Sequence, residues 1–336
     1  MLIPRSLVAI FVLLFSAVSS AQVNVYSSRK EALILPLLEQ FTTDTGIEVK
    51  LLTGKDDALL RRLSMEGKSS PADLLITTDV ARLHRAKSMQ LTQAVASDLL
   101  YKVIPAAWRD TEDHWFALTS RARPIIYAPS RVNPEQFNRY EDLASTQWQG
   151  RLCLRSSDNV YNQSLVASAL IANGQAQTLA WLQGMVANLA RPPAGGDTDQ
   201  LKAVAAGMCD VTLANTYYLA RLTRSDNSGD NFVASQLAVF WPNQADRGAH
   251  FNISGVAMMR AAKHPEDALA LMHYMVSDKA QLWYAQVNNE YPVAMGVDVP
   301  DVLAAYGTPI ADAVSLVKLG ELNQDVIRLM DQAGWR

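Results

Sequence analysis

Two adjacent tyrosines, Tyr217 and Tyr218, stand where a strand is predicted to give way to a helix. The four residues 211–214 form a short apolar, β-branched run that is typical of a buried parallel strand. Helical character follows, with Asn215 or Thr216 at the expected N-cap. In a strand the two rings would point to opposite faces, but in the first turn of a helix they are only about 100° apart. Both can therefore lean over the carboxyl end of the strand, where open α/β sheets bind ligands.

Paired phenols in this position suit a hard, highly charged cation, because a strong Lewis acid displaces the phenolic protons. Fe(III) is the natural candidate. The alternative is that both tyrosines are core or interface aromatics with satisfied hydroxyls. A third tyrosine weighs against that alternative, because Tyr161 lies in a polar loop, 155–163, that follows another predicted strand and precedes a helix. We expect this loop at the same sheet edge as Tyr217 and Tyr218, whereas Tyr26, near the end of the first strand, is expected to be a packing residue.

Strands and helices alternate along the chain, which predicts an α/β protein built on doubly wound parallel sheets with helices on both faces. The pattern changes at the extended segment 120–127, which we interpret as a first crossing into a second lobe, and segment 251–259 is predicted to be the return strand. Roughly 300 residues are more than one core usually holds, so two lobes are expected. We assign residues 22–120 plus 248–298 to lobe 1 and residues 121–247 plus 299–336 to lobe 2. Hinge strands join the lobes, and a ligand is expected in the cleft between them.

The first 21 residues are expected to be a cleavable signal peptide. A short basic start at 1–5 precedes an apolar run at 7–18 and small residues at 19–21, as a secretory signal requires. The apolar run is too short for a comfortable membrane span. The net charge of −3, with both signs dispersed, argues against a nucleic-acid partner. We therefore predict a soluble monomer that is exported to the periplasm.

The two cysteines of the chain, Cys153 and Cys209, each lie in a short apolar, strand-like run. In an oxidising compartment such an isolated pair favours a disulfide between neighbouring strands. The alternative is two buried thiols that act as small hydrophobic side chains.

The signatures of the common enzyme classes are missing from the sequence. It has no Gly-x-Ser-x-Gly elbow, Gly-rich phosphate loop, His-Glu-x-x-His or Cys-x-x-Cys. The five histidines are scattered without ligand spacing. We predict a binding protein that is not an enzyme.

Several segments together resemble the periplasmic ferric-iron-binding proteins of bacterial ABC transporters, which have the type-2 periplasmic-binding-protein fold. The similarity spans almost the whole mature chain, and its segments are 26–33, 70–75, 120–123, 160–164, 215–218, 252–255 and 289–293. The resemblance implies that Tyr161, Tyr217 and Tyr218 coordinate the iron as phenolates. Some relatives add a His-Tyr pair after the first strand, where this chain has Lys30 and Glu31. That departure indicates the subgroup in which three tyrosines bind iron with carbonate or bicarbonate as a synergistic anion, and it leaves Glu31 or water for the remaining coordination positions.

The summed charge of the predicted site indicates that this anion has a basic partner. Three phenolates neutralise Fe(III), so a divalent carbonate would leave the site near −2. Arg121 and Arg123 are two residues apart on a predicted strand, and Arg fits planar oxyanions bidentately. We expect them to bind the anion, with an interdomain salt bridge as the alternative for either one and Arg29 as a weaker third candidate.

The predicted function is capture of Fe(III) in the interlobe cleft and delivery to an inner-membrane ABC permease. The alternative is a carrier of organic anions or phosphonates with the same fold, in which the arginines grip the ligand and the tyrosines stack or hydrogen-bond.

Overall fold

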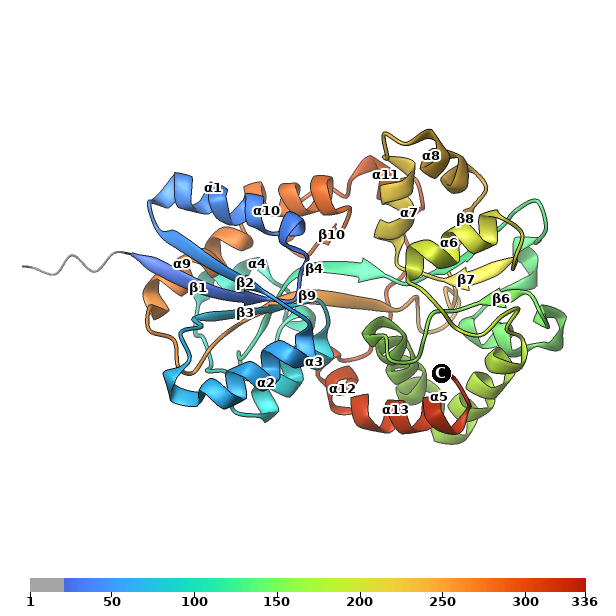
Figure 1. Ribbon diagram of the computed structural model, residues 1–336, viewed down its shortest axis with the longest axis horizontal. Coiled ribbons are helices and arrows are strands. Elements are labelled where there is room, and N and C mark those ends of the chain that lie inside the picture. The colour runs from blue at the N-terminus through green and yellow to red at the C-terminus, as the bar shows by residue number, and fades with distance from the viewer. Residues whose placement is uncertain (1–20) are drawn as a thin grey trace, which may run out of the picture.

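The computed structural model describes residues 21–336 and has two lobes, each built around its own sheet (Figure 1). The larger sheet has the strand order β10-β4-β9-β3-β1-β2, and the smaller one has the order β6-β7-β5-β8. The strands of the larger sheet are β1 Gln22–Ser27, β2 Glu48–Thr53, β3 Leu74–Thr77, β4 Phe116–Ala122, β9 Phe251–Met258 and β10 Tyr291–Pro292. The strands of the smaller sheet are β5 Ile125–Tyr127, β6 Leu152–Cys153, β7 Val211–Leu213 and β8 Ala238–Phe240. The predicted two-lobed α/β fold is confirmed, while the exact residue boundaries of the lobes stay a prediction.

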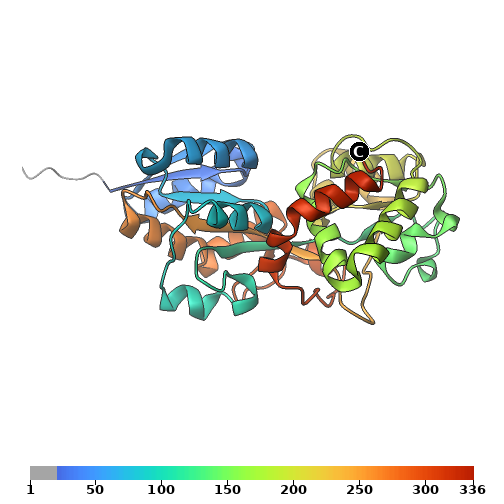
Figure 2. The ribbon, with the colours of Figure 1, turned by 90° about the horizontal axis from the view of Figure 1, so that it is seen from below.

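Helices pack around both sheets (Figures 1 and 2). Those of the first lobe are α1 Leu35–Thr45, α2 Asp56–Glu66, α3 Val80–Ser88, α4 Asp98–Val103, α9 Pro265–Met275 and α10 Asp278–Trp283. Those of the second lobe are α5 Val160–Ala187, α6 Asp197–Ala205, α7 Thr216–Thr223 and α8 Ser228–Ser235. The C-terminal segment adds α11 Asp301–Ala304, α12 Leu316–Glu321 and α13 Asn323–Gln332. In the C-terminal segment, α12 packs on α3 and α13 packs on α5, so this segment contacts both lobes.

The sheets are mixed, so the prediction of parallel sheets is wrong for part of each. In the larger sheet β1 pairs in parallel with β2 and β3, but β9 runs antiparallel to β3 and β4. In the smaller sheet β6 and β7 are parallel, and β5 is antiparallel to both β7 and β8. The physical reason lies in the chain path: β4 leads out of the first lobe and β9 leads back, so neighbouring crossing strands must run in opposite directions.

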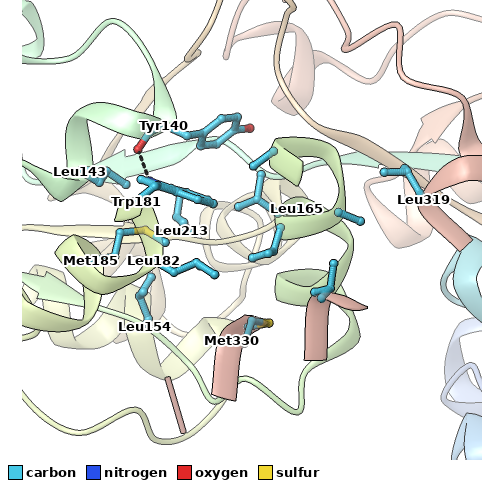
Figure 3. Packing of buried hydrophobic residues seen from close by; sticks show 14 of the residues in the cluster. Tyr140, Leu143, Leu154, Leu165, Trp181, Leu182, Met185, Leu213, Leu319 and Met330 are labelled. Atoms are coloured by element: carbon cyan, nitrogen blue, oxygen red, sulfur yellow. Dashed lines mark hydrogen bonds between the residues drawn. The ribbon is translucent and has the colours of Figure 1, made fainter. Parts of the chain in front are cut away.

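The core of the second lobe fixes the framework behind the cleft. Figure 3 shows Tyr140, Trp181 and Leu165 packed together inside this lobe. The Trp181 indole donates a hydrogen bond to the Tyr140 carbonyl at 2.9 Å, and the Tyr140 hydroxyl donates to the Arg123 carbonyl at 2.8 Å. The backbone thus satisfies the buried polar groups of both rings, and the hydrogen bond from Tyr140 to Arg123 helps to hold the crossing segment in place.

The predicted disulfide is confirmed. Cys153 in β6 and Cys209, just before β7, are bonded, with their Cα atoms 5.8 Å apart. Because β6 and β7 are parallel neighbours, the bridge links two strands of the smaller sheet.

The predicted signal peptide lies almost wholly outside the described residues. Within residues 21–336, none of the helices has the length and apolar character needed to cross a membrane.

Candidate functional site

The three predicted tyrosines come together at the first turns of two helices in the second lobe. Tyr217 and Tyr218 follow Thr216 at the start of α7, and Asn215 has the extended backbone of an N-cap. Tyr161 is the second residue of α5, where the Asn159 side chain accepts hydrogen bonds from the next backbone amides. Helix α7 begins directly after β7, as the sequence predicts, whereas α5 begins at Val160, so Tyr161 lies on this helix and not in the predicted loop 155–163. The two helix starts bring all three rings to one cavity of about 180 Å³.

The cavity lies between the lobes, because its lining comes from both. Residues that follow β1 and β3 or belong to the crossing strand contribute one wall, and the tyrosine helices contribute the other. The lining consists of Ser28, Arg29, Lys30, Leu33, Thr78, Arg121, Tyr161, Tyr217, Tyr218, Arg221 and Glu290. Four of these side chains are cationic and one is a carboxylate, so with neutral phenols the lining carries a net charge of +3 (4 − 1).

The surroundings of Tyr217 and Tyr218 favour the protonated form of both phenols. The rings of Tyr217 and Tyr218 are 4.2 Å apart between centroids, and Tyr217 is almost wholly buried. Burial, followed by the neighbouring Tyr161 and Tyr218, raises the pKa of Tyr217 well above its ordinary value. Burial, followed by Tyr161 and Asp197, raises the pKa of Tyr218 to about 12. A ligand that binds phenolates must therefore displace protons.

Arg121 faces the tyrosines with free hydrogen-bonding capacity. Its guanidinium lies 5.4 Å from the centre of the Tyr161 ring, and its Nη2 donates to Ser254 Oγ at 2.6 Å. Among the described residues this is its one hydrogen bond, and its buried Nε has no partner. Burial opposes its charge, but Tyr161, Glu290 and Tyr217 together raise the pKa of Arg121. The predicted anion-binding arginine therefore lies beside the predicted metal ligands as a full cation.

A buried ion pair between Arg29 and Glu290 lies next to Arg121. Arg29 donates to Glu290 Oε2 at 2.9 Å and to Ser254 Oγ at 2.7 Å, so Ser254 accepts from both arginines. Burial opposes ionisation of Glu290, but Arg29 and Arg121 lower the pKa of this carboxyl. Sequence reasoning gave Glu290 no role, because its pairing with Arg29 spans 261 residues of chain.

Arg221 is a second residue to which sequence reasoning gave no role. Its guanidinium lies 5.8 Å from the ring centres of both Tyr217 and Tyr218. The signal was present, because Arg221 is four residues after Tyr217 and such residues share one face of a helix. Glu31, considered for the remaining coordination positions, is exposed and does not line the cavity.

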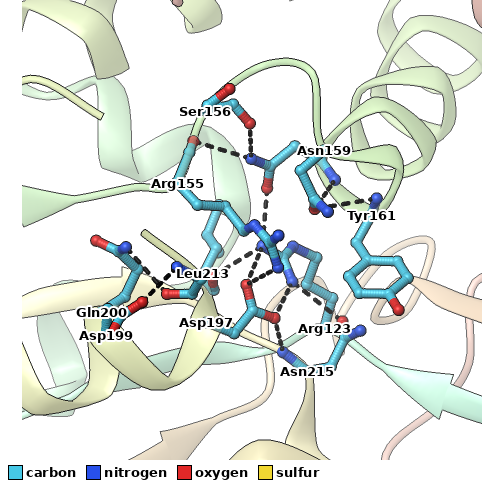
Figure 4. Close-up of polar contacts among 12 residues, drawn as sticks. Arg123, Arg155, Ser156, Asn159, Tyr161, Asp197, Asp199, Gln200, Leu213 and Asn215 are labelled. Carbon is cyan, nitrogen blue, oxygen red and sulfur yellow. Dashed lines mark hydrogen bonds and ion pairs between the residues drawn. The ribbon is translucent and has the colours of Figure 1, made fainter. Parts of the chain in front are cut away.

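Arg123 points away from the cavity, unlike Arg121. Strand β4 ends at Ala122, so the side-chain alternation that places two arginines on one face does not continue to Arg123. Instead Arg123 is buried inside the second lobe, where it pairs with Asp197 at 2.8 Å (Figure 4). The structure thus brings Tyr161, Tyr217, Tyr218 and Arg121 together, and it separates Arg123 from them.

The side chains that usually bind metal ions do not form a cluster within the described residues. Within residues 21–336, no group of three or more His, Cys, Asp and Glu side chains is placed to hold a metal ion. The cavity instead offers phenols and cations, a set suited to a ligand that combines a hard cation with an anion.

Residues 37–308 match the family of bacterial extracellular solute-binding proteins. The chain belongs to this family. Its membership confirms the prediction of a binding protein rather than an enzyme. In sequence the chain is 44% identical to iron uptake protein A1 of Synechocystis over 315 residues, which are 94% of this chain and 88% of the relative.

Solved structures of related proteins match the same share of this chain, 94%. A Trichodesmium protein in complex with iron and citrate ligands is 44% identical, with a TM-score of 0.90, and the match covers 94% of this chain and all of that one. The ferric binding protein from Campylobacter jejuni is 36% identical, with the same TM-score and coverage. These relatives confirm the resemblance to ferric-iron-binding proteins and the two-lobed fold.

Proposed function

We propose that this solute-binding protein captures Fe(III) between its lobes through the phenolates of Tyr161, Tyr217 and Tyr218. The observation that carries the proposal is the convergence of these three rings, from two separate helices, on one small interlobe cavity. Phenolate oxygen is a hard anionic ligand, and ferric iron is a hard cation that lowers the pKa of the groups it binds. The names of the relatives, an iron uptake protein and a ferric binding protein, support the same cargo.

The charge of the cavity supports an anion as part of the cargo. Three phenolates cancel the net charge of +3 on the lining, and Fe(III) then adds three positive charges. An anion bound to the iron reduces this excess, and Arg121, which lines the cavity 5.4 Å from the Tyr161 ring centre, has donors that no protein group uses. Carbonate or bicarbonate is our proposed synergistic anion. Citrate is a second candidate, because the Trichodesmium relative was solved with iron and citrate.

The same charge favours one alternative function. A cavity with Arg29, Lys30, Arg121 and Arg221 in its lining also suits an organic anion or a phosphonate without a metal. In that case the tyrosines would serve as neutral hydrogen-bond donors, which the raised pKa values of Tyr217 and Tyr218 permit.

The physiological role that we propose is import. The exported monomer binds iron in the periplasm, the lobes assigned above (22–120 plus 248–298, and 121–247 plus 299–336) close on it, and the complex delivers iron to an inner-membrane ABC permease. Release is promoted by protonation of the phenolates or by loss of the anion, since both weaken the metal site.

A visible absorption spectrum separates the two functions. Addition of ferric citrate to the iron-free protein in bicarbonate buffer should give a broad phenolate-to-iron charge-transfer band and an orange or red colour. The band should weaken or disappear in Y161F, Y217F and Y218F. Y26F is the matched control, because Tyr26 hydrogen-bonds to Glu66 at 3.0 Å and does not line the cavity.

A protein that stays colourless with its tyrosines intact would refute the iron proposal. Binding of an organic anion or a phosphonate by that colourless protein, measured by calorimetry, would establish the alternative.

A further inference from the structure

Arg123 lies where the chain crosses between the lobes, in the short link between β4 and β5. Its backbone is fixed there, because its amide donates to the His250 carbonyl at 3.1 Å and its carbonyl accepts from the Tyr140 hydroxyl at 2.8 Å. Its side chain is almost wholly buried and reaches into the second lobe (Figure 4). A buried guanidinium is costly unless its donors are satisfied, so its partners are informative.

The partners of Arg123 include one residue close in sequence to Tyr161 and one close to Tyr217 and Tyr218. Nη2 donates to Asn162 Oδ1 at 2.8 Å, and Asn162 directly follows Tyr161 on α5. Nη1 donates to Asn215 Oδ1 at 3.1 Å, and Asn215 is the N-cap residue of α7, just ahead of Tyr217 and Tyr218. One rigid guanidinium therefore bridges the first turns of both helices that carry the tyrosines.

Asp197 is the third side chain that contacts the Arg123 guanidinium. Its carboxylate accepts from Arg123 Nη1 at 2.8 Å and from the Asn215 amide at 3.1 Å. Arg123 Nη2 also donates to the Leu213 carbonyl at 3.0 Å, at the end of β7. We call the four side chains of Arg123, Asn162, Asp197 and Asn215 the arginine clamp.

The hydrogen-bond count of the clamp leaves Arg123 little capacity for a cavity anion. Its two Nη groups carry four hydrogens, and five acceptor atoms lie within hydrogen-bond distance of them: both carboxylate oxygens of Asp197, Oδ1 of Asn215, Oδ1 of Asn162 and the Leu213 carbonyl. Its one group without a partner is Nε, which is buried. Arg121, by contrast, uses one Nη in its contact with Ser254. The two arginines thus have different tasks although they are two residues apart.

We infer that Arg123 is a positioning residue that sets the distance between Tyr161 and the Tyr217–Tyr218 pair through the arginine clamp. The inference rests on the proposed function, in which these tyrosines bind iron. Binding groups must be held within about 0.5 Å of their productive geometry. The first turns of α5 and α7 are far apart in sequence, and the clamp provides a direct polar link between them.

The test compares R123K and N215A with the wild-type protein. R123K keeps a positive charge beside Asp197 but cannot bridge both asparagines, because Lys lacks the planar fork of Arg. N215A removes only the link to α7. We expect R123K to weaken iron binding roughly 10–100-fold, as loss of groups that orient metal ligands does, and N215A to weaken it about fivefold, the value of one hydrogen bond.

Two further readouts distinguish positioning from a general loss of stability. The first is the energy and width of the phenolate-to-iron band, which should change in R123K because the oxygens no longer converge in the same geometry. The second is the control K87M, which breaks an ion pair of the first lobe, between Lys87 and the buried Asp110 at 2.7 Å; Lys87 belongs neither to the clamp nor to the cavity lining. K87M should lower the melting temperature and leave iron affinity within about twofold of the wild type, as expected for an independent site.

Each outcome decides the question. Wild-type affinity and an unchanged band in both R123K and N215A would overturn the inference, and so would equal effects of R123K and K87M on affinity. Failure of the wild-type protein itself to give the band would instead refute the proposed function.

Discussion

The affinity for Fe(III) is expected to rise steeply with pH, because the phenols must lose their protons when iron binds. Burial and neighbouring groups raise the pKa of Tyr217 and raise that of Tyr218 to about 12. Both are therefore protonated in the free protein at neutral pH. With one proton released from each of Tyr161, Tyr217 and Tyr218, linkage predicts a change in affinity of about 1000-fold per pH unit.

The environment of Tyr218 gives the size of the barrier that the metal must overcome. Its pKa of about 12 is some two units above that of an ordinary tyrosine, about 10, which corresponds to about 3 kcal/mol of additional cost for the phenolate. A strong Lewis acid supplies this energy through its bonds to oxygen, whereas a weakly acidic divalent ion does not. Because protons compete with iron for the phenolate oxygens, the affinity for Fe(III) falls as the pH falls.

The assay is a competition between the protein and a chelator of known pH dependence, read at the charge-transfer band between about pH 6 and pH 8, where an ordinary phenol is protonated. The slope of log affinity against pH should be close to three for the wild type and close to two for Y217F, since one proton fewer is released. Y26F should keep the wild-type slope. A flat profile, or an equal slope in Y217F and the wild type, would refute the assignment of the phenols as ligands.

Three other changes test the framework and the anion site. Removal of the disulfide in a C153A/C209A double variant should lower the free energy of unfolding by about 4 kcal/mol, because the bridge closes a loop of 56 residues; an unchanged denaturation midpoint would contradict this. G320A should lower the free energy of unfolding by roughly 1–3 kcal/mol despite the better helix propensity of Ala, because an added Cβ would lie 2.4 Å from the Cβ of His84; a more stable variant in chemical denaturation would show that the α3–α12 contact is loose. R121Q should bind iron more weakly and lose the dependence of affinity on bicarbonate or citrate, which titration at constant pH measures; a variant that still responds to the anion would place the anion elsewhere.

Local sequence patterns predicted the features that depend on neighbours along the chain. The run 211–214 followed by Asn215 indicated a strand and a helix start, and these two local elements place Tyr217 and Tyr218 at a sheet edge. The polar run 155–163 placed Tyr161 at the same sheet edge, although α5 begins within this run, at Val160. The bridge between Cys153 and Cys209 was predicted from their number and from the strand-like runs around them.

The direction of the strands could not be obtained from such patterns. An apolar run of a given length looks alike in parallel and antiparallel pairs, so the antiparallel β4, β5 and β9 were missed. Their direction follows from the path of the chain through both lobes, which local periodicity does not contain.

The roles of Arg121 and Arg123 show most clearly that local sequence patterns do not determine tertiary contacts. The spacing of Arg121 and Arg123 predicted one shared face, but β4 ends between them, at Ala122, and the two side chains diverge. Arg121 then meets Ser254, and Arg123 meets Asp197, over sequence separations of 133 and 74 residues. The sequence by itself determined which residue types stand at the ends of the strands. Only the tertiary structure decided which cation faces the cavity and which one is buried behind it, because each choice depends on a partner that folding brings from a distant part of the chain.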